Sequence, residues 1–333
     1  MIMKRDNYPI DIVITWVDSA DEKWLKEKEK FSNEKLDNNK HIGGINRYKD
    51  QGTLQYIFRG IERYMPWARK VFFVTYGHTP SWLNKTCEKL VVVNHKDFIP
   101  NEYLPTFNSN AILLNLHRIP DLSEHFIYFN DDMYVVNDCK KEMFFKHGLP
   151  RDMAVLESVI ACDDDPFWDM MVNNVMVVNK HFSKKQAIKQ KPFKWFSCKY
   201  SFKNNFKNLL YKPFNKFPGF YDTHLPNSHL KSVFSEVWNA EPTICHNTCL
   251  HKFRDSEDIT EWTMRYWQLA SNRFIPINRD KIGKYSSLKD SSAFKLMGNF
   301  KKYKLICLND ETTDRRLFDF FESILKEKSM YEL

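Results

Sequence analysis

The sequence has 333 residues, of which 43% are hydrophobic and 15% aromatic, so it can build a large folded core and is not disordered as a whole. Its formal net charge of +8 favours an anionic partner. The nine glycines form neither a GxGxxG nor a GxxxxGKS/T string. This excludes a Rossmann fingerprint and a P-loop, so any nucleotide must be held in another way.

The seven cysteines are an odd number and lie far apart, which is not the pattern of a disulfide framework. A reducing compartment therefore fits best. Residues 1–8 are polar and no apolar run reaches about 18 residues, so we expect neither a signal peptide nor a transmembrane helix. We expect a cytoplasmic protein, with peripheral contact at the inner face of a membrane as a further option.

Short apolar runs alternate with helix-like segments in the first part of the chain. Four runs that are short, apolar and rich in β-branched or aromatic residues are predicted strands, at 10–17, 70–76, 89–94 and 126–129. The spacing of apolar residues predicts helices at 47–64 and 111–118. Strands that alternate with helices indicate an α/β fold with a mostly parallel sheet flanked by helices.

Polar side chains follow two of these strands. Asn130, Asp131 and Asp132 come directly after the fourth strand, and Trp16 and Asp18 end the first. In an open α/β sheet, ligands bind beyond the carboxyl ends of the strands. Adjacent carboxylates with an amide supply hard oxygen ligands for a divalent cation that holds phosphates. An ordinary polar turn is the alternative, and Trp16 can either stack on a base or fill the core.

Residues 180–216 contain eleven lysines, many aromatic residues and no aspartate or glutamate. Such a stretch can bind nucleic acid, rest on anionic lipid, or form solvated helices with aromatic side chains inside and lysines outside. No nucleic-acid fold signature accompanies the charge, so we expect no nucleic-acid partner. The role of the segment stays open.

The second half of the chain adds three candidates. His224 lies in a loop that contains proline and glycine, where a lone histidine is most often structural. Arg254 lies among acids in HKFRDSED, where it can bind a phosphate or form a surface ion pair. A last apolar strand at 304–310 ends in Asn309 and Asp310, which repeats the ending of the fourth strand.

Four blocks of the sequence resemble the Stealth family of hexose-1-phosphate transferases. They are IDIVITWVD (10–18), the block from RYKDQGTLQYIFRGIERYMPW to HRIPDLSEHFIYFNDDM (47–133), the block from GFYDTHLP to RYWQLAS (219–271), and LICLND (305–310). The second block is a specific signal on its own, because it runs nearly unbroken. In order, the blocks span most of the chain.

The resemblance implies transfer of a sugar 1-phosphate from a UDP-sugar, UDP-GlcNAc or a similar hexose donor, to a glycan hydroxyl. UMP leaves, and the product belongs to a capsular or cell-wall polysaccharide. The implied core is a Rossmann-like or GT-A-like nucleotide-sugar-binding sheet. Two alternatives stay open. One is a conventional UDP-sugar glycosyltransferase that releases UDP, and the other is a non-catalytic protein that binds glycan or a membrane surface.

The resemblance also implies site residues. Phosphoryl transfer needs a base, neutralised phosphoryl oxygens and a stabilised leaving group. We expect His224 to be the base, Arg254 to bind a phosphate, and Asp132 with Asp310 to hold Mg²⁺ or Mn²⁺, with Asn130 orienting. Further substrate-binding residues are expected within the matching blocks, at Trp16, Asp18, Arg47, Asp50, Asn108, Asn110, Arg118 and Asp131.

We expect a single catalytic domain over 1–333. Its nucleotide-sugar-binding α/β part is 1–150, a helical, basic aromatic insertion is 151–218, and 219–333 completes the active site. The expected partners are a UDP-sugar donor and a glycan acceptor. Peripheral contact with an anionic membrane and assembly into a homo-oligomer are left open.

Overall fold

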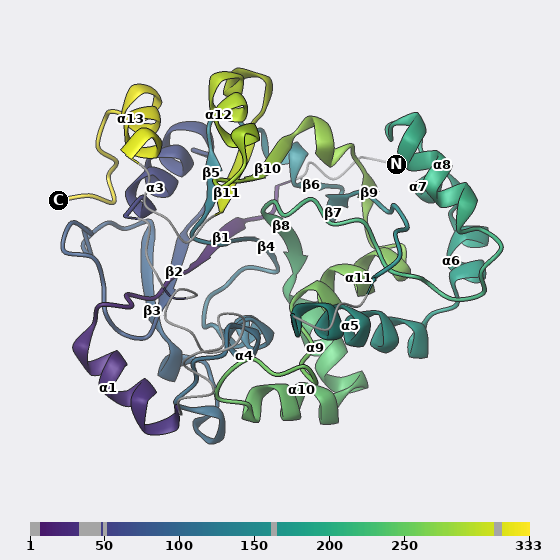
Figure 1. The fold of residues 1–333 in the computed structure, drawn as a ribbon, viewed down its shortest axis with the longest axis horizontal. Helices are drawn as coiled ribbons and strands as arrows, with labels where there is room; N and C mark the ends of the chain where they lie inside the picture. The colour runs from purple at the N-terminus through teal and green to yellow at the C-terminus, as the bar shows by residue number, and fades with distance from the viewer. Residues whose placement is uncertain (1–6, 33–47, 49–51, 161–164, 310–314) are drawn as a thin grey trace.

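A five-stranded sheet forms the centre of the protein. In the structure, a computed structural model, residues 7–32, 48, 52–160, 165–309 and 315–333 are described. The strand order is β3-β2-β1-β4-β8, as Figure 1 shows. The five strands are β1 (Ile10–Thr15), β2 (Val71–Thr75), β3 (Leu90–Asn94), β4 (His125–Phe129) and β8 (Asn227–Leu230). β1 to β4 pair in parallel and β8 pairs antiparallel with β4, which confirms a mostly parallel α/β sheet.

Helices flank this sheet because its strands are mostly apolar and buried. The middle of β1 is fully buried, and every residue of β2 is buried. Such strands must be covered on both faces. The helices that pack into this core or beside it are α3 (Leu54–Tyr64), α4 (Ser109–Leu114), α9 (Lys231–Ala240), α10 (Pro242–Leu250), α11 (Trp262–Ala270) and α13 (Arg315–Ile324). α1 (Glu22–Phe31) carries the separate small cluster around Trp24.

A second, three-stranded sheet lies beside the carboxyl end of β4. Its order is β10-β11-β5, with β5 (Met133–Val135) antiparallel to β11 (Leu305–Asn309) and β10 (Gly283–Ser287) parallel to β11. β5 follows β4 after a three-residue turn, so this sheet brings the ends of β4 and β11 together. α12 (Ser291–Gly298) connects β10 to β11.

A helical arm extends from the sheets and lies at the right of Figure 1. It contains α5 (Phe167–His181), α6 (Lys184–Gln190), α7 (Pro192–Trp195) and α8 (Phe202–Leu210). Its own core contains Trp195, Phe217 and Phe220, together with Trp262 and Tyr266 of α11. A third small sheet of β6 (Phe145–Lys146), β7 (Leu149–Asp152) and β9 (Ile275–Pro276) lies next to it. Among the described residues, none of the helices has the length and apolar character needed to span a membrane.

The predicted elements differ from the observed ones mainly at their ends. The helix expected over 47–64 is observed as α3 from Leu54, and part of the remainder lies outside the described residues. The helix expected over 111–118 divides into α4 and a 3-10 turn at Leu116–Arg118. β5 and β8 were not predicted, because both are short and take their buried faces from their neighbours.

One carboxylate is buried inside the first strand. Asp11 is fully buried in β1 and accepts hydrogen bonds from Arg69 Nε at 2.8 Å, Arg69 Nη2 at 2.6 Å and the Ser123 backbone N–H at 2.7 Å. These contacts tie the start of β1 to the segments before β2 and β4. A buried carboxylate is tolerated when it is paired and hydrogen-bonded in this way.

We predict that Asp11→Ala lowers the free energy of unfolding by about 3 kcal/mol, because it leaves Arg69 without its carboxylate partner and leaves Arg69 Nε and the Ser123 N–H without an acceptor. Urea unfolding followed by circular dichroism measures the change. Glu29→Ala, at an exposed position of α1, is the control and should change the stability by less than about 0.5 kcal/mol. Equal unfolding midpoints for Asp11→Ala and the wild type would contradict this role.

Candidate active site

Asp132 lies where the central sheet meets the second sheet. It follows β4 at the end of the Asn-Asp-Asp turn and is 6% exposed. Its Oδ2 accepts a hydrogen bond from Asn309 Nδ2 at 2.6 Å, and its backbone carbonyl accepts one from the Leu308 N–H at 3.1 Å. The pairing of β5 with β11 therefore brings Asp132 and Asn309 side by side. Asp310 itself lies outside the described residues.

Asn130 is tied to the ends of the two central strands. The Tyr128 hydroxyl donates to Asn130 Oδ1 at 2.5 Å and lies 3.0 Å from Thr15 Oγ1, the last residue of β1. Asn130 is therefore held beside the carboxyl edge of β1 and β4. Asp131, the middle residue of the turn, is exposed.

His224 pairs with Asp132. Its Nε2 lies 3.7 Å from Asp132 Oδ2, an ion-pair distance that is longer than a hydrogen bond. Burial lowers the pKa of His224, but the Asp132 carboxylate raises it more, so the net pKa lies above the ordinary value. Burial raises the pKa of Asp132, but His224 and Asn309 lower it by more. The net pKa lies below the ordinary value, so this carboxyl stays ionised. The structure thus brings together two residues, His224 and Asp132, that lie far apart in the sequence.

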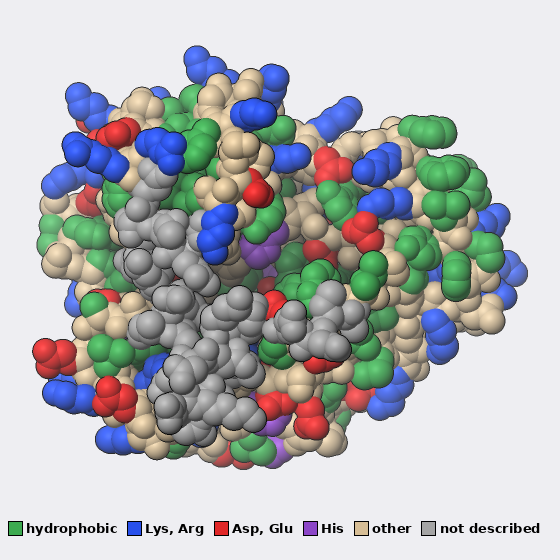
Figure 2. Space-filling view, in the orientation of Figure 1, with side chains coloured by type: hydrophobic (Ala, Val, Ile, Leu, Met, Phe, Trp, Pro, Cys, Tyr) green, Lys and Arg blue, Asp and Glu red, His purple; other side chains and the backbone are tan. Residues whose placement is uncertain are grey.

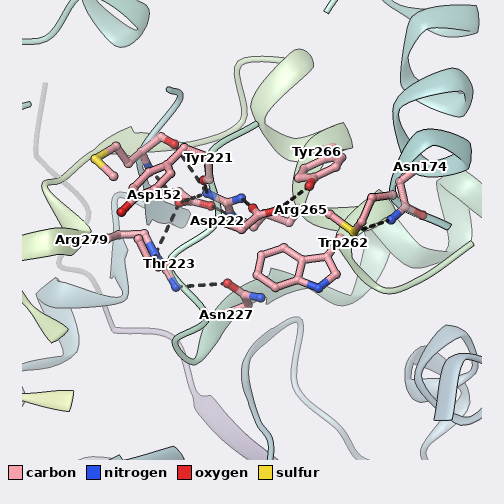
Figure 3. A network of polar contacts seen from close by, with 12 residues as sticks. Asp152, Asn174, Tyr221, Asp222, Thr223, Asn227, Trp262, Arg265, Tyr266 and Arg279 are labelled. Carbon is pink, nitrogen blue, oxygen red and sulfur yellow. Dashed lines mark hydrogen bonds and ion pairs between the residues drawn. The ribbon is translucent and has the colours of Figure 1, made fainter. Parts of the chain in front are cut away.

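The loop that carries His224 is held by two buried arginines, shown in Figure 3. Arg265 of α11 donates to Asp152 Oδ2 at 2.7 Å and also pairs with Asp222. Arg279 donates to Thr223 Oγ1 at 3.0 Å. The same guanidinium also donates to three acceptors just after His224, namely the carbonyls of Leu225 and Pro226 and the side chain of Asn227.

These contacts lie on both sides of His224, whose backbone has a φ of 47°, in the left-handed region. A non-glycine residue adopts this conformation at some cost, so the surrounding contacts must hold it. Burial raises the pKa of Asp222 to about 6, while Arg265 opposes the shift. Arg265 and Arg279 were not predicted from the sequence, since their partners are distant in the chain.

Arg254 has no carboxylate partner among the residues that the structure describes. Its Nε and Nη2 both donate to Ser109 Oγ, at 3.0 and 2.6 Å. Burial lowers the pKa of Arg254. The surface ion pair considered from the sequence is not formed with the described acids of this loop, which have other partners. A half-buried guanidinium with spare donors and no counter-charge is suited to bind an anionic group.

Asp258 organises the Arg254 loop instead of pairing with the arginine. Its carboxylate accepts from Asn108 Nδ2 at 2.8 Å, from Asn110 Nδ2 at 3.1 Å and from the Asp255 N–H at 3.1 Å. His251 Nδ1 lies 2.7 Å from its other oxygen. Asn108 and Asn110 are buried and bonded to Asp258, so in this structure they support the Arg254 loop and their amides are engaged.

Glu261 is a candidate that the sequence analysis missed. It lies just before α11 and is 8% exposed. Its carboxylate accepts from its own backbone N–H and has no hydrogen-bond or ion-pair partner in another residue of the described part of the chain. Burial raises the pKa of Glu261 to about 7, while the charges of Arg254 and His224 oppose the shift. It thus lies in the field of both candidate residues. One signal was present, since Glu261 follows the HKFRDSED block closely at a helix start.

Several expected substrate-binding residues do not lie beside Asp132 and His224. Trp16 is buried, stacks on Phe73 with ring centroids 5.7 Å apart, and so fills the core. Asp18 closes a turn, accepting from the Ala20 N–H at 2.8 Å. Arg118 is exposed and lies over the Trp238 ring, in the segment that precedes the start of β4 at the opposite end of the strand. Arg47 and Asp50 lie outside the described residues.

The donor atoms around Asp132 permit a metal-ion test. Asp132, His224 and Cys307 each offer one ligand atom, all within 4.8 Å of one another. Burial raises the pKa of the Cys307 thiol well above its usual range, so it stays neutral and does not suit Mg²⁺ or Mn²⁺. Asp132 Oδ1 is buried without a hydrogen-bond partner among the described residues. This hard, unsatisfied oxygen fits a divalent cation.

Two family models match the sequence: Stealth protein CR1, conserved region 1, over 8–36, and Stealth protein CR2, conserved region 2, over 47–152. The capsular polysaccharide phosphotransferase WcwK of Streptococcus pneumoniae is 39% identical over 97% of this chain and 98% of its own length. The exopolysaccharide phosphotransferase cps2G of Lactiplantibacillus plantarum is 38% identical over 98% of this chain and 96% of its own. Among solved structures, the bifunctional glycosyltransferase WbbM is 12% identical to this chain, with a TM-score of 0.41. The match covers 98% of this chain and 51% of the WbbM chain.

We predict that Glu261→Gln stabilises the protein at pH 8 but not at pH 4.5. The pKa of Glu261 is about 7 in the folded state, against an ordinary value of 4.5. Between pH 4.5 and pH 7 this carboxyl is therefore protonated in the folded state but ionised in the unfolded state. Stability is therefore lost as the pH rises through this window, by up to roughly 3 kcal/mol. Glutamine stays neutral and avoids the loss. Urea unfolding at both pH values measures it.

Glu257→Gln, at an exposed position of the same loop, is the control for this measurement and should follow the wild type at both pH values. If Glu261→Gln also follows the wild type at both, the carboxylate is not the buried group described here.

Proposed function

The chain belongs to the Stealth family of polysaccharide phosphotransferases, and on that premise we propose that it transfers a sugar 1-phosphate from a UDP-sugar to a glycan hydroxyl and releases UMP. The relatives matched over nearly the full length support a phosphotransferase that acts in capsule or exopolysaccharide synthesis. The observation that carries the proposal is the pairing of a carboxylate and an imidazole, Asp132 and His224, at the carboxyl edge of the sheet. UDP-GlcNAc or a similar hexose is the proposed donor.

The proposed reaction has one displacement. The acceptor hydroxyl oxygen attacks the phosphorus that bears the sugar, and a new P–O bond forms. The bond from this phosphorus to the bridging oxygen breaks, and the bridging oxygen leaves with UMP. The hydroxyl proton passes to the His224 imidazole. The product is a phosphodiester that joins the sugar to the acceptor.

His224 is the proposed base because Asp132 stabilises its protonated form. The carboxylate raises the pKa of His224, and a base of higher pKa takes up a proton more readily when it starts neutral. The two buried arginines hold the loop on both sides of this ring, so the imidazole meets the acceptor in one orientation. Arg265 and Arg279 are therefore positioning residues.

Arg254 is proposed to bind the phosphates of the donor. It has donors to spare beyond the Ser109 hydroxyl, and its loop is fixed through Asp258. Glu261 lies in the field of Arg254 and His224, and is proposed to hydrogen-bond a hydroxyl of the sugar or the acceptor.

A divalent cation, Mg²⁺ or Mn²⁺, would supply further neutralisation of phosphate oxygens. Asp132 Oδ1 would be its ligand, since this oxygen is buried and lacks another partner among the described residues. Oδ2 of the same carboxylate faces Asn309 and His224, so the two oxygens have separate roles. Asp310 is proposed as a second ligand on the strength of the family resemblance.

We predict that the purified protein, given Mg²⁺, a panel of UDP-sugars and candidate glycan acceptors, forms UMP. His224→Ala should lower the rate by about 10²–10⁴-fold, because the acceptor loses its base. Asp132→Ala should lower it at least as much. Mass spectrometry separates UMP from UDP. His147→Ala is the control, since His147 also has a positive φ but is exposed outside this group.

UDP in place of UMP would contradict phosphoryl-sugar transfer and identify a conventional glycosyltransferase. Full activity in His224→Ala or Asp132→Ala would exclude this cluster as the reaction centre. A protein that forms neither nucleotide yet binds glycan would be the non-catalytic alternative.

We further predict that Arg254→Lys raises the KM for the donor by at least about tenfold, because a lysine keeps the charge but loses the planar pair of donors. Steady-state kinetics at saturating acceptor measure this. Arg273→Lys, whose guanidinium pairs with Glu236, should leave the KM unchanged. An unchanged donor KM in Arg254→Lys would show that the Arg254 guanidinium does not bind phosphate.

A further inference from the structure

Helix α8 has its polar side inside and its apolar side outside. Asn204 and Asn208 are buried, whereas Phe202 is 87% exposed and Phe206 is 48% exposed. Leu209 and Leu210, one turn further on, are exposed as well. An amphipathic helix on a soluble domain normally buries its apolar stripe and exposes its polar side. α8 therefore needs a specific explanation.

The inward side is fixed by hydrogen bonds that a rotated helix could not make. Asn208 Nδ2 donates to the carbonyls of Ala154 at 2.8 Å and Trp195 at 2.5 Å, and its Oδ1 accepts from the Leu156 N–H at 2.7 Å. Asn204 Nδ2 donates to Asp280 Oδ2 at 2.9 Å. These contacts satisfy backbone groups of the arm's core. The exposure of the phenylalanines is thus built into the packing of α8.

Neighbouring elements of the arm carry two more exposed phenylalanines. Phe193 of α7 is 85% exposed and Phe214, after α8, is 58% exposed. We call these side chains the α8 surface; its members are Phe193, Phe202, Phe206, Leu209, Leu210 and Phe214. Figure 2 shows hydrophobic side chains gathered on the arm, at the upper right, with lysines and arginines around them. Large exposed apolar side chains that lie together indicate a binding surface.

Lysines accompany this surface, and its own segment supplies no acid; Glu157, from outside the segment, pairs with Lys207 of α8. Residues 180–216 contain no aspartate or glutamate. Several lysines of the arm are exposed, and their side-chain ammonium groups make no hydrogen bond or ion pair within the described chain. They are Lys185, Lys189, Lys191, Lys203 and Lys212. Aromatic and leucine side chains that enter a lipid interface, combined with lysines that meet negative headgroups, are typical of peripheral membrane binding.

A second copy of this chain fits less well, because two lysine-rich surfaces would repel each other at close range. A neutral glycan would leave the lysines without counter-charges. An anionic bilayer satisfies both the apolar and the basic component.

The α8 surface is also connected to the candidate active site. Asp280 accepts from Asn204 of α8 at 2.9 Å and, through its other oxygen, from the Tyr221 hydroxyl at 3.1 Å. Tyr221 begins the loop that Arg265 and Arg279 hold around His224. The Lys207 ammonium lies 4.7 Å from the centre of the Tyr221 ring. The outward-facing helix and the catalytic loop therefore share one set of buried contacts.

We propose that the α8 surface binds the face of a bilayer that contains anionic lipid, with its phenylalanine and leucine side chains in the interface and its lysines on the headgroups. This binding does not depend on the reaction proposed above. It places the loop that carries His224 at a fixed position relative to the membrane, and so favours acceptors that are held there.

The test is flotation of the full chain with vesicles of phosphatidylcholine alone and of phosphatidylcholine with 30% phosphatidylglycerol. The wild type should bind the anionic vesicles at least tenfold more tightly than the neutral ones, and less tightly as salt rises. Phe202→Ser with Phe206→Ser and Leu210→Ser should lower this binding at least tenfold. Lys203→Glu with Lys212→Glu should abolish the preference for anionic vesicles.

Two controls keep the test decisive. Leu250→Ser, at a 44% exposed leucine at the end of α10, should bind like the wild type. All variants should keep the wild-type melting temperature, because the replaced side chains are exposed. No binding of the wild type to anionic vesicles would overturn the proposal. So would a concentration-dependent dimer that the triple variant loses, since this would assign the surface to a second copy.

Discussion

The buried guanidinium of Arg265 joins segments on which the candidate site depends. It pairs with Asp152 at the end of β7 and with Asp222 in the loop before His224, while its own helix begins next to Glu261. A buried charge of this kind is costly to remove from water and is tolerated only when its donors are satisfied. Here the two carboxylates and the Tyr221 carbonyl provide that satisfaction. The geometry of the loop is thus a consequence of electrostatic pairing as much as of apolar packing.

Charge is distributed unevenly between the candidate site and its supports. Asp258 is near Arg254 in sequence, yet its carboxylate is bonded to two asparagines and a histidine. Within the described ranges, the arginine side chain therefore has only the Ser109 hydroxyl as an acceptor. Glu261 likewise has no partner in another described residue, and burial raises its pKa to about 7 although its own backbone N–H donates to it. Both features cost stability in the free protein. Groups kept ready in this way are a common property of sites that bind charged substrates.

The sequence predicted those parts of the structure that depend on local pattern. Apolar runs located β1, β2, β3, β4 and β11, and Asp132 after β4 does lie beside Asn309 at the end of β11. The antiparallel edge strand β8 was missed because NSHL carries no strand pattern of its own; its burial comes from pairing with β4. The sequence left open whether Trp16 fills the core or stacks on a base. In the structure it is buried and packs against Phe73 in the core.

Long-range pairing explains the remaining differences. The roles of Arg265 and Arg279 could not be predicted, because their acceptors are more than forty positions away in the chain. The idea that aromatic residues of 180–216 form the core holds for Trp195 but not for Phe193 or Phe202. Which side of α8 faces inward is set by Asn208 and its backbone partners, which no periodicity of apolar residues reveals.

The order in which the strands occur along the chain has a consequence for biosynthesis. The central sheet is complete once β8 has been made, at Leu230, whereas Asn309 comes almost eighty residues later. A growing polypeptide on the ribosome has therefore made all five strands while Asp132 still lacks the neighbour that β11 delivers. Helices that cover the sheet, among them α11 and α13, also come after β8. The covered core and the arrangement around Asp132 are thus both late events in translation.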